Sequence, residues 1–92
     1  MIKSFAHKGL EKFYLTGDKS GIQPAHANKL AIQLAALNEA VKIEDIDVPS
    51  WRLHLLKGKM KNYWSIVVNA NWRLTFTFDG EGFELINYQD YH

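Results

Sequence analysis

The amino-acid sequence predicts an α+β fold, in which an N-terminal strand and two helices precede a four-stranded antiparallel meander, with the helices packed on one face of the sheet. The chain has 92 residues, 47% of them hydrophobic, which suits one small core, so we expect a single domain over residues 1–92. Apolar residues recur at helical spacing as far as Val41 and with a period of two beyond Ser50. This change of period marks the passage from helix to sheet.

The first half of the chain carries one strand pattern and two helix patterns. Residues 2–5 form a short apolar stretch suited to a strand. A short helix that stops at Gly17 is predicted by the spacing of Leu10, Phe13 and Tyr14. A longer helix follows Pro24, which suits a first helical turn, and its core-facing stripe comprises Ala27, Leu30, Leu34, Leu37 and Val41.

The second half alternates as a sheet does. A strand is predicted from Trp51, with Trp51, Leu53 and Leu55 on one face and Arg52 and His54 on the other. Residues 57–62 form a polar hairpin loop before a second strand over residues 63–68. The next strand sets Trp72, Leu74, Phe76 and Phe78 against Arg73, Thr75 and Thr77, and Asp79-Gly80 turns the chain into the last strand. The polar face is left for function.

Composition narrows the classes of function. The absence of cysteine excludes disulfides, thiolate nucleophiles and thiolate zinc sites. The net charge is only +1, yet residues 48–78 contain no acidic residue. This stretch holds five basic residues, Arg52, Lys57, Lys59, Lys61 and Arg73, and such a locally positive surface can bind phosphate. Apolar runs are short and no secretory signal is recognisable, so we expect a cytoplasmic protein without a membrane partner.

The residue types on the polar face suit the cleavage of RNA. Metal-free cleavage requires a base for the 2′-hydroxyl, an acid for the leaving 5′-oxygen and cations for the phosphorane. His54, Asp90 and His92 are candidates for acid and base, while Lys57 and Arg73 can neutralise the phosphate. Tyr91 offers a ring on which a base could stack. The tail can approach His54 if it runs along the same edge of the sheet.

Plainer interpretations stand beside this one. His54 can be an ordinary polar-face residue, the loop lysines can guard an edge, and residues 90–92 can be a frayed tail. His54, Asp90 and His92 could also imitate a metal site, although the neighbouring cations would repel a divalent ion. A hydrolase triad is disfavoured because the chain has no Gly-x-Ser-x-Gly elbow, and it has no Gly-rich phosphate loop.

The chain resembles the HigB branch of the RelE/ParE toxin superfamily along essentially its whole length. The matching segments are Met1-Ile2-Lys3-Ser4-Phe5, His7-Lys8-Gly9-Leu10, Leu53-His54-Leu55-Leu56-Lys57-Gly58, Tyr63-Trp64-Ser65-Ile66, Asn71-Trp72-Arg73-Leu74-Thr75-Phe76 and Asn87-Tyr88-Gln89-Asp90-Tyr91-His92. The resemblance implies a RelE-like fold and a ribosome-dependent messenger-RNA endoribonuclease that cleaves in the decoding site without metal or cofactor. It implies a catalytic set of His54, Asp90, Tyr91 and His92, with Lys57, Arg73, Arg52, Lys59 and Lys61 on the RNA. The division between acid and base stays open.

The resemblance also implies partners and leaves rivals. The expected partners are a HigA-like helix-turn-helix antitoxin, the 70S ribosome and messenger RNA, with operator DNA contacted only through the antitoxin. The rival from another class is a ParE-like protein that binds DNA gyrase and catalyses nothing, since one scaffold can host both functions. A third interpretation is an RNA-binding module without toxicity. Catalytic residues at positions 54, 90 and 92 are expected only of the nuclease.

Overall fold

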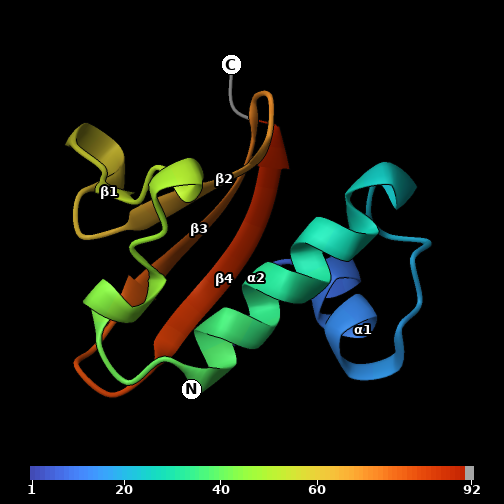
Figure 1. The fold of residues 1–92 in the computed structure, drawn as a ribbon, viewed down its shortest axis with the longest axis horizontal. Helices are drawn as coiled ribbons and strands as arrows, with labels where there is room; N and C mark the ends of the chain where they lie inside the picture. Colours follow the sequence, from blue (N-terminus) through green and yellow to red (C-terminus); the bar gives the residue numbers. More distant parts are fainter. Residues whose placement is uncertain (91–92) are drawn as a thin grey trace.

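A computed structural model describes residues 1–90 and has two α-helices packed on one side of a four-stranded antiparallel sheet (Figure 1). The helices are α1 (Lys8–Thr16) and α2 (Ala27–Glu39), and the strands are β1 (His54–Leu55), β2 (Trp64–Asn69), β3 (Trp72–Phe78) and β4 (Phe83–Asp90). The strands follow one another in the sheet in the order β1-β2-β3-β4. The predicted α+β class and meander are confirmed.

Helix α1 begins and ends where local chemistry allows it. His7 caps its first turn, because the ring Nδ1 accepts a hydrogen bond from the N–H of Leu10 at 2.9 Å. Gly17 ends it in the left-handed conformation (φ 81°), and its N–H donates to the carbonyl of Phe13 at 2.8 Å. Between these caps, Leu10 and Phe13 are buried. The predicted short helix is confirmed.

Helix α2 supplies most of the apolar layer beneath the sheet. Its buried residues are Ala27, Leu30, Gln33, Leu34 and Leu37, so four of the five predicted stripe positions are right. Val41 is the exception, because the helix ends at Glu39 and Ala40 turns the chain into an extended conformation that leaves Val41 71% exposed. Gln33 is a buried polar residue whose amide nitrogen donates to the carbonyl of Val67 in β2 at 2.8 Å.

Two glycines let α1 approach the turn that precedes α2. A Cβ on Gly9 would lie 2.8 Å from the carbonyl oxygen of Gly21, and one on Gly21 would lie 2.6 Å from the Cα of Gly9. Real side chains do not tolerate such distances, so both positions require glycine for this backbone contact.

The N-terminal segment covers the outer edge of β4 without forming a full strand. Ile2 bridges Phe83 and Phe5 bridges Ile86, both in parallel orientation. The N–H groups of Lys3 and Ala6 donate to the carbonyls of those same β4 residues at 2.8 Å. The ladder is interrupted where Leu85 takes a positive φ of 55°, and there the hydroxyl of Ser4 accepts the N–H of Leu85 at 2.9 Å. The predicted first strand is therefore two separate bridges.

The predicted strand from Trp51 is wrong at its start. Pro49–Trp51 form a 3-10 helix, Arg52 adopts a left-handed backbone (φ 52°, ψ 50°), and β1 begins only at His54. Trp51 is buried as expected, but from a helical turn rather than a strand. Leu55, expected in the core, is 48% exposed because β1 is an edge strand with a neighbour on one side only.

The core lies between α2 and the helix-facing side of β2, β3 and β4. Alternation along β3 is as predicted, with Leu74 and Phe76 fully buried against the helices. Near the end of the sheet Trp72 stacks on Tyr88, with ring centroids 4.6 Å apart. The hydroxyl of Tyr88 lies 2.6 Å from Nδ1 of the buried His26, and burial raises the pKa of this phenol above its ordinary value. His26, to which the sequence assigns no role, is thus part of the core.

Candidate functional site

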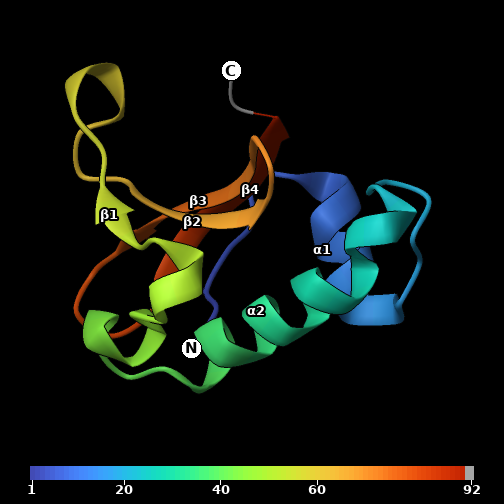
Figure 2. The same ribbon diagram turned by 45° about the horizontal axis from the view of Figure 1, so that its top comes forward.

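The face of the sheet turned away from the helices carries a row of polar side chains. Figure 2 shows α1 and α2 on one side of the sheet and no α-helix on the other. Cross-strand partners point to the same face, so the strand register alone builds the row. His54 pairs with Ser65, Ser65 with Thr75, and Thr75 with Asn87, which places one residue of the row on each strand. We call this side the open face.

A second row lies beside the first on the open face. Val67 pairs with Arg73, and Arg73 pairs with Gln89. Arg73 is half-buried, and the amide of Gln89 donates to the hydroxyl of Thr75 at 2.9 Å, which ties the two rows together. His54 and Arg73 are therefore on one face, as the sequence predicts. Two strand spacings and an offset of two residues along the strands separate their backbones, about 12 Å in all, so a phosphodiester fits between their side chains.

His54 is exposed on the edge strand β1. Its Nδ1 lies 3.1 Å from the carbonyl oxygen of Arg52. The other ring nitrogen, Nε2, makes no hydrogen bond with any residue in the range 1–90. The imidazole thus has one nitrogen attached to the main chain and one available to a substrate.

The basic loop rises next to His54. Lys57, Lys59 and Lys61 are all exposed, and the loop contains a short 3-10 helix at Gly58–Met60. Figure 2 shows this loop standing above β1 on the side opposite α2, so it flanks the open face. Within the described part of the chain none of the three lysines forms an ion pair. Arg52 precedes β1, so the register does not place its side chain.

Ser65 is a residue of the open face that sequence reasoning missed. It has no exposed surface, and its hydroxyl makes no hydrogen bond with any residue of the described range 1–90. Its neighbour Thr75 is equally buried but accepts the Gln89 amide. The sequence does carry a signal for it: Ser65 is a small polar residue inside the aromatic and β-branched run 63–68. Its position in the alternation points its side chain to the open face.

Asp90, the last residue that the structure describes, does not lie on the edge that carries His54. Asp90 is the last residue of β4 and lies at the edge of the sheet opposite to β1. It pairs with Trp72, which stacks on Tyr88 on the helix side, so the register also places Asp90 off the open face. For Asp90, the condition that the tail shares the edge of His54 is not met, because a meander places its first and last strands at opposite edges. In both views the end of β4 lies beside the β2–β3 turn (Figures 1 and 2). Tyr91 and His92 lie outside the described residues.

The structure does not bring together His54 and Asp90, two residues of the alternative metal site. Among residues 1–90, no three His, Asp or Glu side chains gather closely enough to hold a metal ion. Of the alternative set, His54 and Asp90 are at opposite edges, and His92 is outside the described range.

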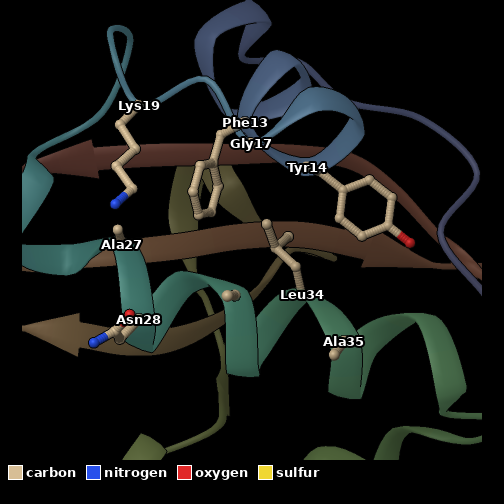
Figure 3. A pocket seen from close by; sticks show the side chains of 9 residues that line it. Phe13, Tyr14, Gly17, Lys19, Ala27, Asn28, Leu34 and Ala35 are labelled. Atoms are coloured by element: carbon tan, nitrogen blue, oxygen red, sulfur yellow. The ribbon is translucent and has the colours of Figure 1, made fainter.

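A separate hollow of about 480 Å³ lies between α1 and α2, on the helix side of the molecule (Figure 3). It is lined mainly by apolar side chains, among them Phe13, Tyr14 and Leu34. None of the site residues predicted from the sequence lines it. The candidate chemistry is therefore on the open face and not in this hollow.

Three comparisons with known proteins bear on this site. Residues 3–92 match a family model described as the RelE-like toxin of the type II toxin-antitoxin system HigB. The curated Endoribonuclease HigB of Proteus vulgaris is 41% identical over 92 residues, which is all of this chain and all of that protein. A solved mutant of YafQ from E. coli superposes with a TM-score of 0.65 at 15% identity, covering 98% of this chain and 93% of that one, which shows a shared RelE-like fold.

Proposed function

The chain belongs to the HigB-like family of RelE-like toxins from type II toxin-antitoxin systems, and on this premise we propose that it is an endoribonuclease that cleaves messenger RNA in the decoding site of the ribosome. The enzyme class is supported by the full-length identity with a protein named an endoribonuclease. The observation that carries the chemistry is that His54 and Arg73 project from one helix-free face.

The proposed reaction is an internal transfer of the phosphodiester. A base removes the proton of the 2′-hydroxyl, the 2′-oxygen attacks phosphorus, and the bond to the 5′-oxygen breaks as an acid protonates that oxygen. Asp90 or His54 serves the 2′-hydroxyl, and His92 or His54 serves the leaving oxygen. Arg73 and Lys57 neutralise the charge that develops on the phosphate. No metal ion takes part in this scheme.

The RNA is proposed to cross the open face from β1 toward the end of β4. Such a path passes the lysine loop, His54 and Arg73. Asp90 pairs with Trp72, so it lies at the opposite edge of the sheet and, by register, on the helix side rather than on the open face. Because the base and the acid act on the same phosphodiester, a role of Asp90 beside His54 requires the end of β4 to move toward His54 when RNA binds. Lys59, Lys61 and Arg52 add sequence-independent attraction to phosphates. Tyr91 is proposed to stack on a base.

The partners follow from the family. As a type II toxin the chain has an antitoxin partner. We propose that this is a HigA-like helix-turn-helix protein, that operator DNA is contacted only through it, and that the toxin works in the cytoplasm on 70S ribosomes. No helix in residues 1–90 is long and apolar enough to cross a bilayer.

The test is cleavage of a defined messenger on programmed ribosomes in the presence of EDTA. The wild type is expected to cut ribosome-bound messenger and to leave naked RNA intact. His54→Ala should lose at least about 100-fold in rate while still binding ribosomes. Lys57→Ala should weaken binding, and Lys19→Ala, an exposed lysine on the helix side, is the matched control. Absence of scission together with inhibited gyrase supercoiling would overturn the nuclease and favour the ParE-like alternative.

A further inference from the structure

Arg52, two residues before the start of β1, has a backbone conformation that arginine rarely adopts. Arg52 has φ 52° and ψ 50°, in the left-handed region that favours glycine, asparagine and aspartate. Its N–H donates to the carbonyl of Pro49 at 3.3 Å and so ends the 3-10 helix Pro49–Trp51. Trp51 is anchored in the core, and two residues after Arg52 the chain must pair with β2 at Ser65. One left-handed residue makes this change of direction.

The conformation determines where the carbonyl of Arg52 points. In an extended antiparallel strand ψ is about 135°, so the value of 50° turns this carbonyl by about 85° from the direction that a continuous strand would give it. In that orientation its oxygen lies 3.1 Å from Nδ1 of His54. Because a carbonyl oxygen can only accept, Nδ1 must carry the hydrogen of this bond.

The hydrogen bond therefore selects one form of the imidazole. In neutral His54 the proton is on Nδ1 and the lone pair is on Nε2, the ring nitrogen farther from the backbone. In the protonated ring both nitrogens carry hydrogen, and the Nδ1 contact is unchanged. Either way, the proton that can be exchanged with a substrate is the one on Nε2.

We propose that Arg52 is a positioning residue that acts through its main-chain carbonyl, fixing His54 in the Nδ1–H tautomer so that Nε2 is the atom that exchanges a proton with RNA. This inference deepens the proposed nuclease function and rests on it for the identity of the substrate. It differs from a phosphate-binding role of the Arg52 side chain, because the carbonyl remains when the guanidinium is removed.

The tautomer can be measured without any assay of activity. The full chain, labelled with ¹⁵N in histidine, gives long-range ¹H–¹⁵N correlations for each ring, and the spectrum of His54→Ala identifies the signals of His54. Above the titration of the ring, the wild type is expected to show a protonated-type Nδ1 and an unprotonated-type Nε2. The opposite assignment in the wild type would overturn the proposal, whether or not the protein cleaves RNA.

Three substitutions at one position separate the carbonyl from the side chain. Arg52→Gly and Arg52→Asn tolerate a positive φ and should keep the Nδ1–H form, with kcat close to wild type and KM raised by loss of the guanidinium. Arg52→Val is branched at Cβ and disfavours this conformation, so it should show mixed tautomers and a kcat at least about 10-fold below that of Arg52→Gly. If Arg52→Val does not fold, the tautomer of His54 in the wild type still decides.

Two outcomes distinguish this proposal from the nuclease proposal. A fall in kcat for Arg52→Gly as large as that for Arg52→Val, with the tautomer preserved, would overturn the role of the carbonyl and assign the effect to the guanidinium. Absence of cleavage in every form, with the Nδ1–H signal present in the wild type, would overturn the nuclease while supporting the tautomer assignment.

Discussion

The two faces of the same sheet bury their residues in different ways. On the helix side Ile66, Leu74 and Phe76 have no exposed surface, and each removes apolar area from water against α1 or α2. On the open face Ser65 and Thr75 are equally buried, although they are polar. Buried hydroxyls need partners, and the hydroxyl of Ser65 has none in the part of the chain that the structure describes. The helix side also holds one such buried polar atom, Oε1 of Gln33, which has no hydrogen-bond partner among residues 1–90. The two sides therefore differ in proportion: the helix side is mainly apolar and contributes most of the stability, while the open face buries a row of hydroxyls.

The largest effect should come from the helix side. Phe76→Ala removes a fully buried ring from the middle of β3 and should lower the free energy of unfolding by about 3–5 kcal/mol. Urea denaturation followed by tryptophan fluorescence measures it. A loss below about 1 kcal/mol would show that the helix side is not the main source of stability.

Gln33 tests the polar link between the two layers. Gln33→Ala leaves the carbonyl of Val67 without the amide donor from α2, but it also removes the buried Oε1, which has no partner among residues 1–90, so the net cost should be about 1 kcal/mol. The control is the next residue in the helix, since Ile32 is 61% exposed and Ile32→Ala should change stability by less than about 0.5 kcal/mol. Equal effects of the two substitutions would contradict the importance of the buried amide.

On the open face, removal of the buried Ser65 hydroxyl should not lower the free energy of unfolding. Ser65→Ala removes an unpartnered buried hydroxyl and should leave the free energy of unfolding unchanged or raise it by up to about 1 kcal/mol. Thr75→Val is the matched change on the next strand, and it should cost about 1 kcal/mol because it removes the acceptor of the Gln89 amide. If both variants lose stability alike, the hydroxyl of Ser65 has a partner after all.

The smallest effect concerns the β3–β4 turn, which belongs to neither face. Asp79 accepts hydrogen bonds from the ammonium of Lys3 at 2.6 Å and from the N–H groups of Gly82 and Glu81, and these hold the pKa of its carboxyl below the usual value. A lowered pKa in the folded state contributes stability above the unfolded pKa, and this contribution is lost as the pH falls below about 4. Asp79→Asn should flatten the acid limb of the stability curve in thermal melts. An unchanged limb would argue against this pairing.

The same comparison shows what the sequence could and could not predict. Alternation along β3 correctly separated Leu74 and Phe76 from Arg73 and Thr75, because a period of two is imposed by the backbone itself. The start of β1 was wrong, because Trp51 is buried from a 3-10 turn and Arg52 takes a conformation that depends on tertiary contacts. No local sequence pattern indicates that Arg52 takes the left-handed conformation.

For the candidate site, the sequence predicted which residue types are present better than it predicted how far apart they lie. That His54 and Arg73 share a face followed from the alternation of side chains along the strands alone. The distance of Asp90 from His54 did not, since parity places a residue on a face and says nothing about which edge it occupies. The burial of Ser65 could not be predicted, because burial on a helix-free face depends on how neighbouring side chains fill it.

The bridges that join residues 2 and 5 to residues 83 and 86 have a consequence for how the protein is made. Each bridge joins residues 81 positions apart, so the entropy of closing a long loop opposes the contact before it forms. This edge of the sheet cannot close on a growing chain until β4 has been synthesised. A nascent chain that holds both helices but not β4 therefore leaves the N-terminal segment without its partner strand.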